Sequence, residues 1–120
     1  METPEHRSTD PRKVRGHLDV LHHVAIPVQD LDATVDWYLE RFSCSVAYRD
    51  STWALLRFRN CDLAFVMPGE HPPHHAIVRE DAESFGELVT HRDGSRSCYL
   101  ADPSDNRVEV CAPDHLEMPC

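Results

Sequence analysis

The chain contains the same short sequence twice. Residues 23–30 read HVAIPVQD and residues 74–81 read HHAIVRED. Four positions coincide without a gap: His23 with His74, Ala25 with Ala76, Ile26 with Ile77, and Asp30 with Asp81. A period of about 50 residues indicates a duplicated unit whose copies must pack against each other to bury their apolar faces. This duplication constrains the fold more strongly than any other feature of the sequence.

The length of 120 residues suits one domain. Residues 1–18 are expected to form a flexible N-terminal tail, because they carry proline and charge but no periodic apolar face. Residues 19–113 are expected to form the domain, with repeat one at 20–67 and repeat two at 73–113. Residues 114–120 are expected to form a C-terminal tail.

Repeat one has the pattern of a strand, a helix and three further strands. LHHVAIPV reads as a strand, and Pro27 indicates a strand end or an edge strand. Asp30 is predicted to cap the helix that follows. Three β-prone runs come next: CSVAYR, TWALLRFR and DLAFVM. The predicted helix LDATVDWYLERF places five apolar side chains on one face: Leu31, Val35, Tyr38, Leu39 and Phe42.

Repeat two is shorter. HHAIV, SRSCYLAD and RVEVCA read as strands, and EDAESFGELV is a weaker helix candidate interrupted by Gly86. In an alternative interpretation, GELVTH is a strand that pairs with SRSCYL through a turn at Asp93 and Gly94. Both interpretations remain open at this point. The predicted fold class is α+β, with two βαβββ repeats, the second shortened, forming a cupped mixed sheet.

The composition excludes several function classes. Hydrophobic residues make up 41% and charged residues 28% of the chain, and the net charge is -9. This charge argues against nucleic acid and anionic membranes as partners, because both require clustered Lys and Arg. The five cysteines are odd in number and form no C-x-x-C pair. Together with the absence of an apolar leader or spanning segment, they predict a cytoplasmic protein with free thiols.

The duplicated histidines are candidates for metal binding. Strand residues alternate between faces, so His23 lies with Ala25 and His74 lies with Ala76. If the two strands occupy equivalent places in a cupped sheet, both imidazoles face one cavity. Neutral imidazole is the commonest metal ligand in proteins.

Glu109 is the candidate for a third ligand. It lies between Val108 and Val110 in the last predicted strand, where a carboxylate is costly to bury unless it is paired. The alternative is an edge strand with Glu109 in water. The functional interpretation is that Glu109 completes a set of two histidines and one carboxylate.

Two segments, HHVAIPVQDLDATVDWYLERF and YLADPSDNRVEV, carry a family resemblance. Their motifs, H-x-A-I before a D-L-x-A helix and D-P-x-x-N-R-x-E-x, resemble the two ends of a vicinal oxygen chelate domain. This superfamily includes glyoxalase I, extradiol dioxygenases, methylmalonyl-CoA epimerase and the fosfomycin- and bleomycin-resistance proteins. The resemblance covers residues 20–113 and implies metal ligands at His23, His74 and Glu109. In that register, the adjacent His22 and His75 are expected to point the opposite way.

Some members of this superfamily use a fourth ligand from the last strand of repeat one. Aligning DLAFVMP with RVEVCAP sets Ala64 opposite Glu109, and a slip of one residue offers Phe65 instead. Neither side chain can bind a metal. The nearby Glu70 and His71 lie in a turn and are weak candidates.

Three ligands leave about three octahedral positions open, which is the arrangement of non-haem Fe(II) oxygenases. Fe(II) is therefore the favoured cofactor, and Mn(II) or another divalent metal is the alternative. The predicted activity is of the dioxygenase type on a vicinal-dioxygen substrate such as a catechol.

Tyr99 matches a tyrosine often found in such enzymes, and the resemblance implies a hydrogen bond to substrate or a proton transfer. His91 is a weaker candidate for a general base. Two other functions remain open: a divalent-metal isomerase, lyase or transferase, and a metal-free protein that sequesters a drug or metabolite. By resemblance, the chain is expected to form a homodimer in which one site can take ligands from both subunits.

Overall fold

The structure is a computed structural model that describes residues 18–92, 94–114 and 116. Most of the predicted N-terminal tail (1–17) and of the predicted C-terminal tail (115 and 117–120) therefore lies outside the described residues. The elements follow in chain order: β1 (Val20–Pro27), α1 (Leu31–Arg41), β2 (Ser45–Arg49), β3 (Trp53–Arg57), β4 (Asp62–Val66), β5 (His74–Val78), a 3₁₀ turn η3 (Ala82–Ser84), β6 (Val89–Thr90), β7 (Arg96–Ala101) and β8 (Arg107–Cys111).

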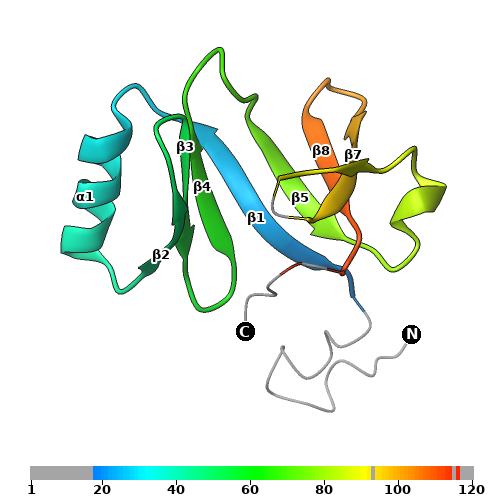
Figure 1. The fold of residues 1–120 in the computed structure, drawn as a ribbon, viewed down its shortest axis with the longest axis horizontal. Coiled ribbons are helices and arrows are strands. Elements are labelled where there is room, and N and C mark those ends of the chain that lie inside the picture. The colour runs from blue at the N-terminus through cyan, green and yellow to red at the C-terminus, as the bar shows by residue number, and fades with distance from the viewer. Residues whose placement is uncertain (1–17, 93, 115, 117–120) are drawn as a thin grey trace, which may run out of the picture.

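All strands join one mixed sheet in the order β2-β3-β4-β1-β5-β8-β7-β6 (Figure 1). Strand β1 runs parallel to β4, and β5 runs parallel to β8. The two halves, β1–β4 and β5–β8, meet where β1 pairs with β5 in the antiparallel sense. The order of strands is thus the same on either side of this seam. The duplication predicted from the sequence is present as two pseudo-symmetric halves of one sheet.

The register fixes which residues are equivalent between the halves. Ala25 pairs with Ala64, and Ala76 pairs with Glu109. Since Ala25 and Ala76 share a position in the repeat, Ala64 occupies the place of Glu109. The alternative that put Phe65 there is wrong, because Phe65 pairs one residue further along β1.

Helix α1 lies on the outer face of the first half. The Asp30 side chain accepts a hydrogen bond from the backbone N–H of Ala33 at 3.0 Å, which confirms the predicted N-cap. Two residues of the predicted apolar face remain largely in solvent, Leu39 at 38% and Phe42 at 49% exposure. Phe42 is the C-cap with an extended backbone, so it leaves the helical face. The core under the helix comprises Val28, Leu31, Val35, Ala54, Leu56 and Phe65.

The second half replaces the long helix with a short turn. Of the two interpretations left open for this segment, the helix over residues 80–89 is not formed, because only Ala82–Ser84 are helical and they make a 3₁₀ turn. The alternative strand within GELVTH is present as Val89–Thr90, which pairs with β7. The turn that follows includes Gly94 at φ 89°, whereas Asp93 lies outside the described residues. The segment between β5 and β7 is too short for both a full helix and a strand.

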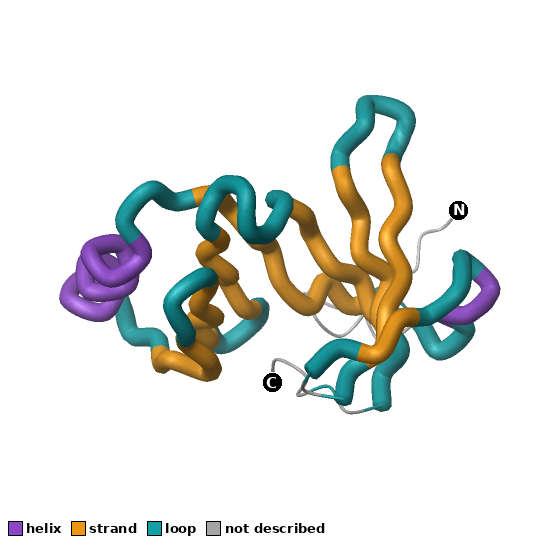
Figure 2. The backbone as a smooth tube through the Cα atoms, turned by 45° about the horizontal axis from the view of Figure 1, so that its top comes forward, coloured by secondary structure: helices purple, strands orange, loops and turns teal. Residues whose placement is uncertain are grey.

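Helix α1 and the η3 turn lie at opposite ends of the molecule, with the strands between them (Figure 2). The outer face of the second half has its own small core of Ala82, Cys98, Val110 and Ala112. Nothing helical in the described part of the chain has the length and apolarity to traverse a bilayer. The alternate residues of each strand face inward, where they line the cavity described next.

Candidate metal site

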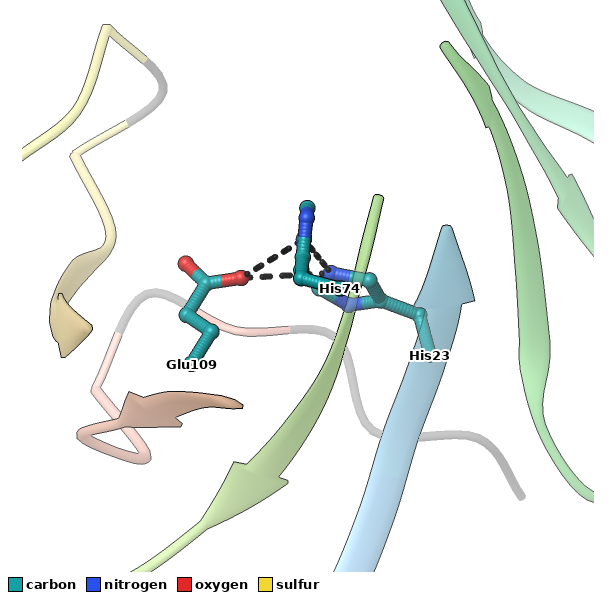
Figure 3. Close-up of side chains that lie close together, drawn as sticks. All are labelled: His23, His74 and Glu109. Atoms are coloured by element: carbon teal, nitrogen blue, oxygen red, sulfur yellow. Dashed lines mark hydrogen bonds and ion pairs between the residues drawn. The ribbon is translucent and has the colours of Figure 1, made fainter. Parts of the chain in front are cut away.

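Three neighbouring strands bring the predicted ligands together. His23 lies on β1, His74 on β5 and Glu109 on β8, and their side chains point toward one another (Figure 3). The Nε2 atoms of the two histidines are 3.1 Å apart. Glu109 Oε1 lies 3.3 Å from His23 Nε2 and 3.2 Å from His74 Nε2. These three residues form a group whose ligand atoms can reach one ion.

The spacing of the three atoms fits a divalent metal. Two donors at about 2.1 Å from one ion lie roughly 3.0 Å apart at a right angle and roughly 3.4 Å apart at a tetrahedral angle. The separations of 3.1–3.3 Å fall within this range. Each atom is also mainly a hydrogen-bond acceptor when its group is in the ligating state. Three acceptors that converge so closely are well suited to a cation.

The tautomer of His74 is fixed from behind. Its Nδ1 lies 2.9 Å from the carbonyl oxygen of Pro72, which can only accept, so Nδ1–H donates. Nε2 is thereby the nitrogen of His74 that would bind an ion, and in the metal-free protein it carries the proton that is donated to Glu109. Burial lowers the pKa of His74, but hydrogen bonds to Glu109 and to the Pro72 carbonyl outweigh it and raise the pKa above its ordinary value in the metal-free protein.

Glu109 is 6% exposed and divides its two oxygens between two sets of partners. Oε1 faces the two imidazoles, whereas Oε2 accepts a hydrogen bond from the Ser97 hydroxyl at 2.7 Å. His91 Nε2 lies 2.6 Å from the same hydroxyl oxygen. Because the Ser97 proton goes to Glu109, the His91 N–H donates to Ser97. Ser97 and His91 therefore orient the carboxylate through Oε2, the oxygen that does not contact His23 and His74.

The charge on Glu109 is stabilised by these partners. Burial by itself raises the pKa of the Glu109 carboxyl, but hydrogen bonds from His23, His74 and Ser97 outweigh it. The pKa is held well below its ordinary value. Glu109 is consequently ionised at neutral pH, as a metal ligand must be.

The alternation of a regular strand predicted that His22 points away from the site. The structure shows the opposite. Strand β1 changes register against β5 between Leu21 and His23, so His22 sits in a β-bulge. Its ring lines the same cavity as His23, and its Nδ1 lies 2.8 Å from His23 Nδ1. His75 follows the regular alternation: it does not line the cavity, and it acts electrostatically on Asp102.

The cavity in front of the three groups has a volume of about 620 Å³. Its wall from strands β2, β3 and β4 is mainly apolar and aromatic besides Arg57, with the Trp53 ring stacked on Tyr48 at 4.5 Å between ring centroids. Ala64, at the position equivalent to Glu109, belongs to this wall. His71 lines the cavity too, but its Nε2 contacts the Thr52 hydroxyl at 3.1 Å and is not part of the ligand group. Glu70 lines a separate, shallow pocket in the turn.

Tyr99 stands in the cavity wall of the second half. Its ring meets the His74 ring edge-on, with centroids 5.8 Å apart, and its side chain is 40% exposed. Burial of the hydroxyl, together with the charge of Glu109, raises the pKa of Tyr99 well above its ordinary value. The hydroxyl therefore keeps its proton at neutral pH. It can donate a hydrogen bond to a molecule in the cavity.

Sequence reasoning missed the roles of three residues of the site: Ser97, His22 and Arg57, which forms an ion pair with the buried Asp62. Ser97 could have been found, because it precedes Tyr99 by two positions on one strand and so shares its face. Arg57 and Asp62 could have been found as facing residues of the β3–β4 hairpin. His22 could not, because a bulge depends on how two strands pair.

No protein-family model and no curated protein matches the chain. Solved structures do match. A variant of methylmalonyl-CoA epimerase from Streptomyces coelicolor, in complex with 2-nitronate-propionyl-CoA, is 20% identical with a TM-score of 0.63, covering 79% of this chain and 97% of that chain. The chain has the vicinal oxygen chelate fold.

Two further structures with this fold are similar over most of their length. The hypothetical protein BH1468 from Bacillus halodurans is 15% identical with a TM-score of 0.63, covering 83% of this chain and 98% of that chain. Methylmalonyl-CoA epimerase from Mycobacterium tuberculosis is 17% identical with a TM-score of 0.62, covering 78% of this chain and 87% of that chain. At these identities the vicinal oxygen chelate fold is what the likeness establishes, so the reaction must be argued from the site.

Proposed function

We propose that this protein is a divalent-metal enzyme that binds a small substrate through two adjacent oxygens. His23, His74 and Glu109 serve as the metal ligands. The observation that carries the proposal is the convergence of their three donor atoms, at 3.1–3.3 Å, from three separate strands. A metal-free protein that sequesters a drug has no need for such a set.

Fe(II) is the metal that this donor set favours, with Mn(II) or another divalent ion as the alternative. When bound, the ion would polarise the substrate oxygens as a Lewis acid and, as Fe(II), would supply redox chemistry with dioxygen. Ala64 supports the oxygenase reading, because a methyl group at the position equivalent to Glu109 contributes no fourth ligand. The reaction type is thus a dioxygenase reaction that adds both atoms of O₂ to a catechol-like diol and opens its ring.

The residues around the ligands suit such a substrate. Trp53 and Tyr48 offer an aromatic wall against which a flat ring can lie. Tyr99, which keeps its proton, donates a hydrogen bond to a substrate oxygen. Ser97 and His91 hold Glu109 in place. The chain thereby orients the diol, while the apolar wall limits water in the cavity.

The test is oxygen uptake by protein loaded with Fe(II) in the absence of air and then mixed with catechols. We expect one metal per chain, consumption of O₂, and an absorbance band of the ring-opened product. The variant His74→Ala is expected to lose both metal and activity, whereas the control His75→Ala on the outer face keeps them. A wild-type protein that takes up no metal would contradict the proposal.

A second candidate is an isomerase or lyase that needs no oxygen. The observation in its favour is that His71 and His91 line the same cavity, since imidazole is the commonest general acid or base in enzymes. Turnover of α-hydroxy carbonyl compounds or hemithioacetals by the Mn(II)-loaded protein under argon would select it over the dioxygenase. Dioxygenase activity would be absent under these conditions.

We also propose a homodimer. One chain supplies all three ligands, so the set is complete without exchange of halves between subunits. Apolar side chains on the outside of the first half are suited to a subunit contact: Trp37, Leu39, Phe42 and Val46. Sedimentation at micromolar concentration is expected to give a dimer, and a monomer that still binds metal would refute this part of the proposal.

A further inference from the structure

Strand β1 departs from regular pairing at one residue. Leu21 pairs with Ile77, and His23 pairs with the next residue of β5, Ala76, so His22 is the extra residue. Such a bulge interrupts the alternation of side chains. The imidazole of His22 consequently turns to the inner face, where it is only 4% exposed and lies behind the ring of His23.

The two rings are joined by a short contact. Their Nδ1 atoms are 2.8 Å apart, and their planes cross at 82° with centroids 5.0 Å apart. One nitrogen must carry a proton and donate it to the other, because two lone pairs would repel at this distance. The contact is therefore an N–H···N hydrogen bond between the His22 ring and the ring nitrogen of His23 that does not face Glu109.

The equivalent nitrogen on the other half of the sheet has a different partner. His74 Nδ1 bonds to the carbonyl oxygen of Pro72 at 2.9 Å. That oxygen fixes the tautomer that leaves Nε2 free to bind an ion. His22 occupies the corresponding place behind His23, so the bulge supplies a side chain where the second half uses its backbone.

We propose that His22 is a positioning residue of the metal site. Its Nδ1 accepts the hydrogen bond from His23 Nδ1–H, and this bond fixes both the tautomer and the ring orientation that direct the His23 Nε2 lone pair at the ion. The proposal rests on the proposed metal-binding function of His23, His74 and Glu109. Partners behind metal-binding histidines typically contribute about 10–100-fold to metal affinity.

The first test measures Zn²⁺ affinity by competition with a chromophoric chelator. His22→Leu, which keeps the volume but removes the ring nitrogens, is expected to weaken binding about 10–100-fold. His22→Asn places an amide oxygen near the position of Nδ1 and is expected to recover most of the loss. His75→Leu, the same change on the outer face of β5, is expected to leave the affinity unchanged. If the role of His22 were purely structural, the Asn and Leu variants would have the same metal affinity whenever their stabilities are equal.

The second test uses the wild-type protein and does not depend on the folding of any variant. Nitrogen-15 NMR of the Zn²⁺-loaded chain is expected to show His23 as the Nδ1–H tautomer, with a coupling across the hydrogen bond to His22 Nδ1. Absence of this coupling, or equal Zn²⁺ affinity of His22→Leu and wild type, overturns the role of His22 alone. A wild-type protein that binds no metal overturns the proposed function as well.

Discussion

The two halves of the sheet share their strand order and register, yet they differ in what they carry. The first half has an eleven-residue helix over a substantial core, and its strands β2, β3 and β4 line the cavity with mainly apolar side chains besides Arg57. The second half has only a 3₁₀ turn over a small core, and its inner face carries the carboxylate and the polar side chains Ser97 and Tyr99. The two halves thus share one topology but differ in role: the first half provides most of the packed core, and the second half provides the carboxylate and more polar side chains.

The sharpest contrast is between Ala64 and Glu109, which occupy equivalent positions. In a symmetric duplication both would bind the ion or neither would. Here one half contributes a histidine alone, and the other contributes a histidine and a carboxylate.

The largest expected effect comes from removing the Glu109 carboxylate, which makes the two halves alike at this position. Glu109→Ala places alanine at both equivalent positions and removes a direct ligand. We expect Zn²⁺ or Fe²⁺ affinity to fall by more than the roughly 100-fold that marks the upper range for outer partners. Isothermal calorimetry on the purified variant would measure this. Metal binding at the wild-type level would show that the site lies elsewhere.

The difference between the two cores can be tested by truncation. Phe65→Ala, at a fully buried position of the first half, is expected to lower the free energy of unfolding by about 3–5 kcal/mol. Val110→Ala in the second half removes fewer atoms from a smaller core and is expected to cost only about 2 kcal/mol. Urea denaturation of the metal-free proteins would give both values. Equal losses would contradict the view that the first half is the scaffold.

The two halves can also be made alike by adding a carboxylate to the first half at position 64. In Ala64→Glu a second carboxylate enters the mainly apolar wall, and in the metal-free protein its burial is expected to cost more stability than the roughly 1–3 kcal/mol of an uncharged polar group. With metal present the variant is expected to bind the ion more tightly, while oxygen uptake with catechols falls because an open position is filled. Ala47→Glu, a change at another cavity-lining alanine, serves as the control. Unchanged metal affinity would show that Ala64 is too far from the ion to matter.

The smallest expected effect is the pH dependence of the interaction between His74 and Glu109, both of which lie in the second half. In the metal-free protein the pKa of His74 is raised above its ordinary 6.5, and that of Glu109 is lowered below its ordinary 4.5. Their mutual stabilisation is therefore fully present between these two values. It is lost as the pH rises through the raised pKa of His74, or as it falls through the lowered pKa of Glu109.

The measurement is the difference in unfolding free energy between the metal-free wild type and His74→Gln across this range. This difference in unfolding free energy should shrink as the pH rises above 6.5, because His74 then loses the proton that it shares with Glu109. Metal affinity has the opposite trend and rises with pH, since a proton competes with the ion for the imidazole. His75→Gln is the matched control. A difference that grows with rising pH would contradict the assigned direction of the His74 shift.

Much of the fold could be predicted because the repeated sequence marks equivalent strands. Alternation along β1, β5 and β8 was enough to place His23, His74 and Glu109 on one face, and the structure brings them together. The equivalence of Ala64 and Glu109 also followed from the repeat. Their role as ligands and the role of Tyr99 remain proposals that the experiments above address.

Other features depend on interactions that a single sequence does not display. The segment 80–89 contains helix formers, yet the chain before β7 must also form β6, which leaves room for only a 3₁₀ turn. The bulge at His22 arises from pairing between β1 and β5. The turn D-P-S-D-N lacks the glycine of the usual D-P-D-G form, and Asp105 adopts the positive φ of 67° instead.

The position of the ligands at the seam between β1 and β5 means that a bound ion would also hold the two halves together. One imidazole comes from each side of the seam, so the ion would cross-link the two copies of the repeat at the line where they are joined by backbone hydrogen bonds. A slip of β5 by one residue would turn His74 to the outer face and dismantle the ligand set. A bound metal would therefore stabilise only the correct alignment of the two copies, and it would add to the free energy of unfolding that the metal-free protein already has.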